Sequence, residues 1–398
     1  MTASTTAASY GADIYTDQAL LEPYGHYRSL RELGPAVWLE QHSAYAVSRY
    51  ADARAVLADA ETFASANGIA LNKPANDAIL GCTLASDGQR HRRLRRVVAH
   101  RMLPRALRPM REMVEEKAEA LVARLVRQGS FDAVTDLARA LPLSVVPDFI
   151  GWPAEGREHL LEWAGANFDS FGPLNERVRE ALPRCGEMAA FGAEIVRTGN
   201  VAAGSLGAGV LQSRDDGEVS TEECMMLMLD YLAPSLDTTI SAIGSAIWLF
   251  GTHPAQWDAL RSDPGLVANA VNEVVRVETP VRAFGRLAAR DTEIGGVPIP
   301  AGSRVLVLYA SANRDERKWD RPDEFDVTRG NAGEMLGFGY GVHSCAGQEL
   351  AKMEIEFLLT ALARSVPGFR LGEPQRALNN VIRAFAALPV AVVGQGEV

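Results

Sequence analysis

Apolar residues recur every three or four positions along most of this chain, with charged residues between them. This spacing is typical of amphipathic helices, because it places the apolar side chains on one helical face. It predicts helices over residues 51–57, 114–127, 136–150, 157–168, 175–196, 221–250, 254–261, 266–278 and 345–365. Most of the middle of the chain is therefore expected to be helical.

Strand patterns are few and lie towards the two ends of the chain. Residues 37–40 and 45–49 resemble a hairpin, and 292–294, 297–299 and 305–309 follow one another with Gly and Pro between them. Because these strands do not alternate with helices, the pattern excludes a doubly wound nucleotide-binding sheet and a barrel of parallel strands. We expect a mainly α fold with small side sheets. No repeat or Pro/Ser-rich linker divides it, so residues 1–398 are expected to form one domain.

Composition and charge narrow the range of partners. The chain has 398 residues, of which 47% are hydrophobic and 23% charged, as in ordinary globular proteins. Forty basic and fifty acidic residues give a net charge of -10, which argues against binding nucleic acid or an anionic membrane over the whole surface. No stretch reaches the roughly 20 apolar residues of a membrane span, and residues 1–20 lack the features of a secretory signal. We therefore expect a cytoplasmic protein.

The four cysteines, Cys82, Cys185, Cys224 and Cys345, form no CxxC pair and are too few for a disulfide framework. Cys345 stands out, because the glycine-rich segment FGYGVHSCAG (338–347) carries it to the start of a helical pattern. Backbone N–H groups and a helix N-terminus lower the pKa of a thiol, and the thiolate is the form that binds metal. Two other interpretations are a buried structural cysteine and a nucleotide-binding loop. The second lacks the preceding strand and the βαβ context that it requires.

Four residues of this segment, Phe338, Gly341, Cys345 and Gly347, match the pattern FxxGxxxCxG, so the chain resembles the cytochrome P450 family. The resemblance implies a helical bundle that encloses haem b, with small peripheral β-sheets. It makes Cys345 the axial thiolate of the iron, with Phe338 and Gly347 beside it and His343 next to a haem propionate. A thiolate ligand favours O–O cleavage, as an oxygen-inserting haem requires.

Charged residues elsewhere fit the same family. Glu273 and Arg276, at i and i+3 of a predicted helix, resemble a buried structural pair that Arg329 joins. His91, Arg95 and Arg286 resemble the groups that bind the haem propionates, and without the cysteine segment they would be taken for surface charges.

Asp237 and Thr238 resemble the acid and alcohol of the family's oxygen-activating element, which relay protons. The alternative is an ordinary helical threonine whose hydroxyl bonds a preceding carbonyl. The family usually has Ala-Gly where this chain has Pro234-Ser235. Because proline has no N–H, the Asp230 carbonyl loses its helical partner, and we expect the helix to kink or open there.

Nine arginines and a single acid lie between Arg90 and Glu112. A solvated helix face is the ordinary interpretation. The family resemblance suggests instead that these arginines, Arg92 and Arg93 among them, surround the cysteine side of the haem and bind an acidic ferredoxin, reduced in turn by a ferredoxin reductase. The chain has no flavin or nicotinamide module and no cysteines for an iron–sulfur cluster.

Within the family, the chain resembles bacterial members that demethylate methoxylated aromatic acids. Phe168, Phe171, Val281 and Phe284 would form a flat apolar pocket for a benzene ring, unless they are ordinary core residues. The further pocket residues expected from the resemblance are Asn67, Leu71, Leu229, Asp230 and Ala233.

The arginines and serine that hold a substrate carboxylate in those relatives are replaced here by Asn67, Leu229 and Asp230. Asp230 would repel an acid, so a neutral methoxyphenol of the guaiacol type is expected. Arg282 could bind an acid if it pointed inward, but strand alternation would direct it opposite to Val281.

The residues together predict a haem-thiolate monooxygenase that uses O2 and two electrons to hydroxylate or O-demethylate a small aromatic substrate. Three alternatives remain open at this point: a demethylase of methoxybenzoate-type acids, a peroxide-driven peroxygenase, and a haem-thiolate sensor or carrier that does not oxidise its ligand. A haem-free structural protein is opposed by the set of Cys345, His91, Arg95 and Arg286.

Overall fold

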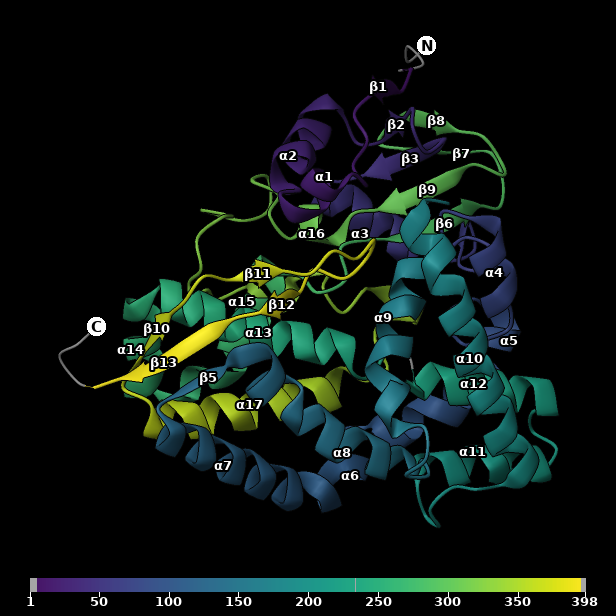
Figure 1. The fold of residues 1–398 in the computed structure, drawn as a ribbon. Helices are drawn as coiled ribbons and strands as arrows, with labels where there is room; N and C mark the ends of the chain where they lie inside the picture. The colour runs from purple at the N-terminus through teal and green to yellow at the C-terminus, as the bar shows by residue number, and fades with distance from the viewer. Residues whose placement is uncertain (1–5, 233, 395–398) are drawn as a thin grey trace.

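The computed structural model describes residues 6–232 and 234–394 and is predominantly helical (Figure 1). The α-helices are α1 (Asp17–Leu21), α2 (Tyr24–Leu33), α3 (Tyr50–Ala58), α4 (Lys73–Ile79), α5 (Gly88–Ala99), α6 (Pro104–Leu107), α7 (Arg111–Gln128), α8 (Ala140–Ile150), α9 (Leu160–Ser170), α10 (Glu176–Thr198), α11 (Leu206–Asp215), α12 (Thr221–Leu232), α13 (Asp237–Thr252), α14 (Pro254–Ser262), α15 (Val267–Val277), α16 (Tyr309–Ala312) and α17 (Gln348–Ser365). The mainly α fold expected from the sequence is confirmed.

The strands are short and form small sheets. They are β1 (Ala8–Tyr10), β2 (Val37–Leu39), β3 (Ala44–Val47), β4 (Phe63–Ala64), β5 (Ser130–Asp132), β6 (Phe284–Ala288), β7 (Thr292–Ile294), β8 (Val297–Ile299), β9 (Arg304–Val307), β10 (Gly368–Leu371), β11 (Gln375–Arg376), β12 (Phe385–Ala387) and β13 (Pro389–Val393). The largest sheet has the order β1-β2-β3-β9-β6-β4 and lies at the top of Figure 1, beside α1 and α2. The predicted hairpin is its β2–β3 pair, in which Val37 lies opposite Ala46.

The helix predicted over residues 221–250 is divided into α12 and α13. The break follows from Pro234, which cannot donate a backbone hydrogen bond and so cannot continue the helix. The opening expected at this position is therefore confirmed.

Helix α11 was not apparent from the sequence, because Gly207 and Gly209 weaken its helical pattern. A β-carbon at Gly207 would lie 2.8 Å from the Ile150 carbonyl oxygen of α8. Close packing against α8 therefore requires glycine at this position and compensates for its poor helix propensity.

A buried ionic triad links helix α15 to Arg329. Arg276 Nε lies 2.7 Å from Glu273 Oε2, and Arg329 Nε lies 3.0 Å from Glu273 Oε1. Arg276 also donates to the carbonyl oxygens of Asn313, Pro322 and Glu324. The triad expected from the family resemblance is confirmed, and its hydrogen bonds join α15 to the segment that precedes the cysteine loop.

Near the centre of the molecule, α13 packs against α17 (Figure 1). The cysteine loop, residues 338–347, leads into α17, while α5, α9, α10 and α12 lie to one side. None of the helices in the described part of the chain is long and apolar enough to cross a membrane.

Candidate haem and substrate site

A cavity of about 470 Å³ brings together segments that lie far apart in the sequence. Helices α5, α9, α10, α12, α13 and α17, strand β6 and the cysteine loop all contribute to its wall. The predicted residues that line it are Arg95, Phe168, Phe171, Leu229, Asp230, Thr238, Val281, Phe284, Arg286, Phe338, His343, Cys345 and Gly347. Cofactor and substrate residues expected from the sequence thus face one shared space.

The cysteine loop is closed by a backbone hydrogen bond, in which Cys345 N donates to Phe338 O over 2.8 Å. Gly341 has a φ of 72°, and a β-carbon there would lie 2.6 Å from the Leu57 carbonyl oxygen of α3. The loop therefore needs glycine both for its left-handed turn and for its close approach to α3. This conformation leaves Cys345 exposed to the cavity.

The pKa of the Cys345 thiol is raised, whereas the sequence predicted that it would be lowered. The cavity is surrounded by many protein atoms, and this burial raises the pKa of Cys345 above its usual value. Backbone N–H groups of Gly347 and Gln348, together with Arg95, act in the expected opposite direction, but burial outweighs them. A cationic iron bound to the sulfur would supply the positive charge that favours the thiolate.

Cationic and imidazole groups gather on the same wall as the cysteine. Arg95 donates to the Ser344 carbonyl oxygen, and Arg286 donates to its neighbour Gly285 O over 2.7 Å. His343 Nε2 lies 3.6 Å from Asp87 Oδ1, whose carboxylate also accepts backbone N–H groups. The cavity therefore presents two guanidinium groups and an imidazole beside Cys345.

His91 lies behind this wall and does not itself line the cavity. Its ring centroid is 4.1 Å from that of His343, it is buried, and its Nε2 atom has no hydrogen-bond partner. Burial, followed by the nearby His343 and Arg95, lowers the pKa of His91 to about 4, so the ring is neutral at neutral pH. An unpartnered buried nitrogen indicates a group that the chain itself does not provide.

These residues fit a haem. The Cys345 thiol lines the cavity beside Arg95, Arg286 and His343, and the described residues contain no cluster of three or more His, Cys, Asp or Glu side chains that could hold a metal ion by themselves. A single axial sulfur ligand with cations for two propionates matches this donor set, whereas a metal site built only from side chains does not.

The side chains of the two residues of the expected proton relay face different parts of the molecule. Thr238 lines the cavity, and its hydroxyl donates to Pro234 O over 2.9 Å. Asp237 does not line the cavity but faces α9, where a β-carbon built on Gly165 would lie 3.4 Å from its Oδ2. Burial raises the pKa of Asp237 to about 7, with Arg139 opposing and Asp169 adding to the shift. Thr238 therefore lines the cavity and Asp237 does not, and the relay through the two residues stays a prediction.

Aromatic rings follow one another along the upper wall of the cavity. Ring centroids are 6.3 Å apart for Phe168–Phe171, 5.9 Å for Phe171–Phe284 and 6.1 Å for Phe284–Tyr309, all in edge-to-face contact. Such packing holds each ring in one orientation. The predicted pocket aromatics therefore form a continuous apolar wall.

Two of the expected pocket residues do not line the cavity, and a third lies outside the described residues. Asn67 is exposed, has a φ of 59° and does not line the cavity, because the backbone turns outward there. Leu71 donates its N–H to Phe171 O and packs into a second core cluster with N-terminal residues. Ala233 lies outside the described residues.

Arg282 is directed away from the cavity, as expected, although not for the expected reason. It precedes β6, and its guanidinium is buried against the carbonyl oxygens of Leu20, Asn379 and Ile382. Val281 lines the cavity instead. The guanidinium of Arg282 therefore does not reach a substrate carboxylate.

Further cavity residues were missed by the sequence analysis. They include Cys82 and Thr83 before α5, Cys185 and Met188 on α10, and Glu354 on α17. Thr83 N donates to Asp230 Oδ2 over 2.8 Å. One signal was present for Glu354, because it lies four residues from both Leu350 and Leu358, on the apolar face of its helix.

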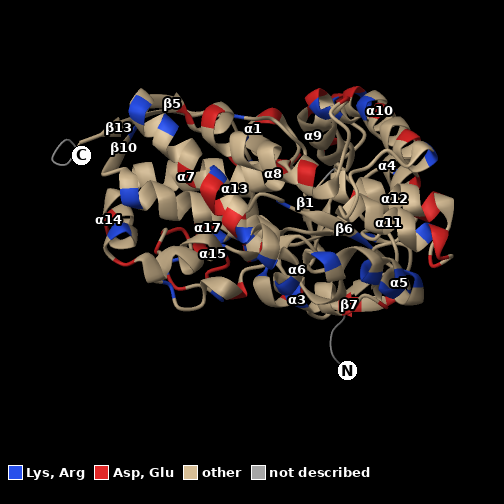
Figure 2. Ribbon diagram, turned by 90° about the horizontal axis from the view of Figure 1, so that it is seen from below, with Lys and Arg blue, Asp and Glu red and all other residues tan. Residues whose placement is uncertain are grey.

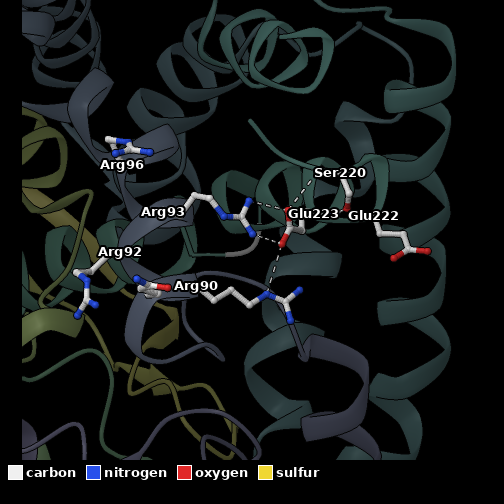
Figure 3. A pocket seen from close by; sticks show the side chains of 8 residues that line it. Arg90, Arg92, Arg93, Arg96, Ser220, Glu222 and Glu223 are labelled. Carbon is white, nitrogen blue, oxygen red and sulfur yellow. Dashed lines mark hydrogen bonds and ion pairs between the residues drawn. The ribbon is translucent and has the colours of Figure 1, made fainter. Parts of the chain in front are cut away.

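The arginine side chains of α5 point in different directions (Figure 3). Arg93 makes two hydrogen bonds to Glu223 of α12, of 2.7 and 2.8 Å, and Arg90 lies 3.5 Å from the same carboxylate (Figure 3). Arg92 and Arg96 point elsewhere and are exposed. Figure 2 shows how Lys and Arg gather on α5. An intramolecular ion pair thus engages Arg93, and the docking of a ferredoxin on these arginines stays a prediction.

Comparisons with known proteins support this assignment of the site. The family model described as cytochrome P450 matches residues 205–366. The protein described as cytochrome p450 CYP199A2, from Rhodopseudomonas palustris (strain ATCC BAA-98 / CGA009), is 40% identical over 387 residues, which cover 96% of this chain and 93% of the relative.

Two solved structures share the fold. P450BioI in complex with a hexadec-9Z-enoic acid ligated acyl carrier protein has a TM-score of 0.86 at 26% identity, over 94% of this chain and 100% of that one. Cytochrome P450 CREJ in complex with (4-ethylphenyl) dihydrogen phosphate has a TM-score of 0.84 at 27% identity, over 94% of this chain and 98% of that one. The chain belongs to the cytochrome P450 family and is a monooxygenase that binds haem b through a cysteine thiolate.

Proposed function

We propose that this monooxygenase oxidises a small, neutral aromatic compound and removes the methyl group of a methoxyphenol of the guaiacol type. The observation that carries the proposal is a cavity with an aromatic wall and with the acidic residue Asp230 in its lining. The solved relative with (4-ethylphenyl) dihydrogen phosphate supports it, since the same fold accommodates a single substituted ring there.

In this proposal Cys345 is the axial ligand, and Phe338 and Gly347 line the cavity beside it. Arg95, Arg286 and His343 hold the propionates, and His91 donates from behind His343. A carboxylate that leaves water needs such charge-assisted partners. When bound, haem supplies the binding of O2 and the oxidising chemistry.

Asp230 selects against acids. Its Oδ2 accepts the Thr83 N–H, and burial raises its pKa to about 6, so it remains mainly ionised at neutral pH. An aromatic carboxylate beside it would meet a like charge in a partly dehydrated cavity. A phenol has no such charge and can donate its hydroxyl to the carboxylate. Phe168, Phe171, Val281 and Phe284 would hold the ring by apolar contact.

The reaction is ArOCH3 + O2 + 2 H+ + 2 e− → ArOH + HCHO + H2O. A C–H bond of the methoxy group is hydroxylated, and the resulting hemiacetal breaks into a phenol and formaldehyde. Thr238 would act as a hydrogen-bonding group at the cavity surface, because its oxygen can still accept while its proton is donated to Pro234 O.

A spin-state titration tests the substrate class. We expect guaiacol to convert the ferric haem towards high spin and to bind at least about tenfold more tightly than 4-methoxybenzoate, and Asp230→Asn to reduce this difference. One formaldehyde should appear for each guaiacol consumed. Tighter binding of 4-methoxybenzoate with a full spin shift would show that the enzyme is an acid demethylase.

The electron donor in the proposal is an acidic ferredoxin served by its reductase. The surface that supports it consists of exposed arginines outside the Glu223 pair: Arg92, Arg96, Arg105, Arg108 and Arg111. The Arg111 guanidinium lies 5.0 Å from the Phe357 ring of α17, the helix that leaves the cysteine loop. This contact places the basic surface next to the helix that follows Cys345.

Stopped-flow reduction tests this docking surface. Arg108→Glu and Arg92→Glu should slow reduction by the ferredoxin at low salt, and the difference should shrink as ionic strength rises. Arg127→Glu, on the exposed end of α7, is the matched control. Equal rates for all three variants would remove the surface from the proposal. Many turnovers with hydrogen peroxide and no ferredoxin would favour the peroxygenase alternative.

A further inference from the structure

Of the described residues that line the cavity, those on helices α4 and α10 include no aromatic ring and no charged side chain. They are Ala75, Ala78, Ile79, Leu182, Cys185, Gly186, Met188 and Ala189. Burial is the largest cause of the raised pKa of Cys185, so this thiol is neutral at neutral pH. A neutral thiol and a thioether behave as apolar groups in packing. This side of the cavity therefore suits an uncharged, apolar group.

Gly186 leaves open space in this part of the wall. A β-carbon built on Gly186 would meet no neighbouring atom within 4 Å, whereas one on Gly192 of the same helix would lie 3.1 Å from Leu229 Cδ2 of α12. Close packing against α12 accounts for glycine at 192. It does not account for glycine at 186, which costs helix stability relative to alanine. Gly186 therefore provides room and not contact.

The fold keeps α4 and α10 apart although they lie next to each other (Figure 1). Asn72, which caps α4, is buried, and its side-chain amide donates to Ser170 O over 2.6 Å and to Gly172 O over 2.8 Å. These bonds attach the start of α4 to the end of α9, while α10 packs against α9 and α12. Moving α4 onto α10 would break buried hydrogen bonds. The space between the two helices is therefore a fixed part of the cavity.

The proposed function leaves part of the substrate ring free to carry a substituent into this space. In that proposal the methoxy group faces the Cys345 side, Asp230 accepts the hydroxyl, and the aromatic wall contacts the ring. An alkyl group on another ring carbon would be removed from water between α4 and α10, and each buried CH2 strengthens binding by about fourfold. A hydroxylated or charged substituent would lose its hydrogen bonds to water and gain no polar partner there.

We propose that the space between α4 and α10 binds an alkyl substituent of the substrate ring, and that Gly186 is the specificity-determining residue for this substituent. The enzyme then prefers alkyl-substituted methoxyphenols, such as 4-propylguaiacol, to guaiacol itself. The inference rests on the proposed function for the orientation of the ring, but the apolar space is independent of how the hydroxyl is recognised.

Spin-state titration of the haem-loaded protein tests the preference. Along the series guaiacol, 4-methylguaiacol, 4-ethylguaiacol and 4-propylguaiacol, we expect the dissociation constant to fall about fourfold for each added carbon. Gly186 is exposed, so the space opens to solvent, and the gain should level off with longer chains. 4-(Hydroxymethyl)guaiacol is the polar control of similar size to the ethyl compound, and it should bind no more tightly than 4-methylguaiacol.

Gly186→Leu tests the residue itself. The leucine side chain would occupy the space that the propyl group needs, so the advantage of 4-propylguaiacol over guaiacol should fall from about 60-fold to less than about fivefold. The variant is expected to fold, because leucine favours helix and its β-carbon meets no neighbour. Ala190→Leu is the matched control, since Ala190 is exposed on α10 outside the cavity lining, and it should keep the full advantage. A normal haem spectrum establishes that each variant has an intact site.

Two results would overturn the inference: equal dissociation constants along the alkyl series, or the same advantage in Gly186→Leu as in Ala190→Leu. Anisole and 4-propylanisole, which have no hydroxyl, separate it from the proposed function. If 4-methoxybenzoate bound more tightly than guaiacol while 4-propylanisole kept an advantage over anisole that Gly186→Leu removes, the methoxyphenol proposal would fail and the alkyl site would stand.

Discussion

Two buried polar regions of this molecule differ in whether the chain completes them. The triad of Glu273, Arg276 and Arg329 pairs every charge and adds backbone carbonyl oxygens as acceptors. On the cavity side, His91 Nε2 and both Glu354 oxygens have no partner. In the triad complete pairing maintains the fold, whereas the unpartnered atoms on the cavity side can be completed by a cofactor, a substrate or water.

The comparison teaches how to separate structural charges from functional ones. Spacing alone does not do so, because Glu273 and Arg276 at i, i+3 look like an ordinary surface pair in the sequence. Burial alone does not do so either, since both regions are buried. The number of hydrogen-bond partners for each buried atom is what distinguishes the two regions.

The largest expected effect comes from replacing Cys345, the proposed iron ligand on the cavity side. Cys345→His should abolish the strongly red-shifted Soret band of the dithionite-reduced, carbon-monoxide-bound protein, because a histidine ligand lacks the charge of a thiolate. Cys185→Ser is the control, as it alters another cavity-lining cysteine. If Cys345→His kept the red-shifted band, a different cysteine would have to be the ligand.

The next largest effect is expected from removing the carboxylate of the buried triad. Glu273→Gln leaves two buried guanidinium groups without their carboxylate, which should lower the free energy of unfolding by about 3–5 kcal/mol. Chemical denaturation measures it, and Arg321→Gln, which removes an exposed pair with Glu324, should cost less than about 1 kcal/mol. Similar losses for both variants would show that complete pairing has no special role.

A third change sharpens the contrast by removing an unpartnered atom. His91→Phe should leave the stability of the haem-free protein unchanged or raised, because Nε2 has no partner to lose. Haem should dissociate about tenfold faster, as expected for one lost hydrogen bond to a charged group. Transfer of haem to an apo-globin measures the rate, with His100→Phe on the protein surface as the control. An unchanged rate would separate His91 from the propionates.

The smallest effect is expected for the ion pair of Arg93 and Glu223, which is paired like the triad but partly exposed to solvent. The hydrogen bond from Arg93 is the largest cause that lowers the pKa of Glu223 to about 2, from an ordinary value of 4.5. A depressed pKa stabilises the fold above the unfolded value and loses that contribution as the pH falls towards 2.

Because the Arg93 side chain is 37% exposed, solvent screens this pair. Glu223→Gln should therefore cost only about 1 kcal/mol at pH 7. The difference from the unmodified protein should vanish near pH 2, as followed by denaturation at a series of pH values. A difference that persists at pH 2 would assign the effect to the N-terminal cap that Glu223 forms with Ser220.

Local features were predictable from the sequence because neighbouring residues decide them. Helical periodicity predicted most helices, Pro234 predicted the break between α12 and α13, and the glycine-rich segment predicted the loop that carries Cys345. The pairing of Glu273 with Arg276 followed from one turn of helix. In each case the relevant atoms lie within a few residues of one another.

Tertiary structure decided the direction of side chains whose partners lie far away along the chain. Asp237 turns to α9 rather than to the cavity, Arg93 is held by Glu223 across 130 positions, and Asn67 lies outside the pocket. Glu354 is buried without a hydrogen-bond partner only in the folded chain, where α17 packs against α7, α13 and α15. The physical reason is that burial, and with it protonation and hydrogen bonding, depends on which distant segments pack together, and a linear pattern does not contain that information.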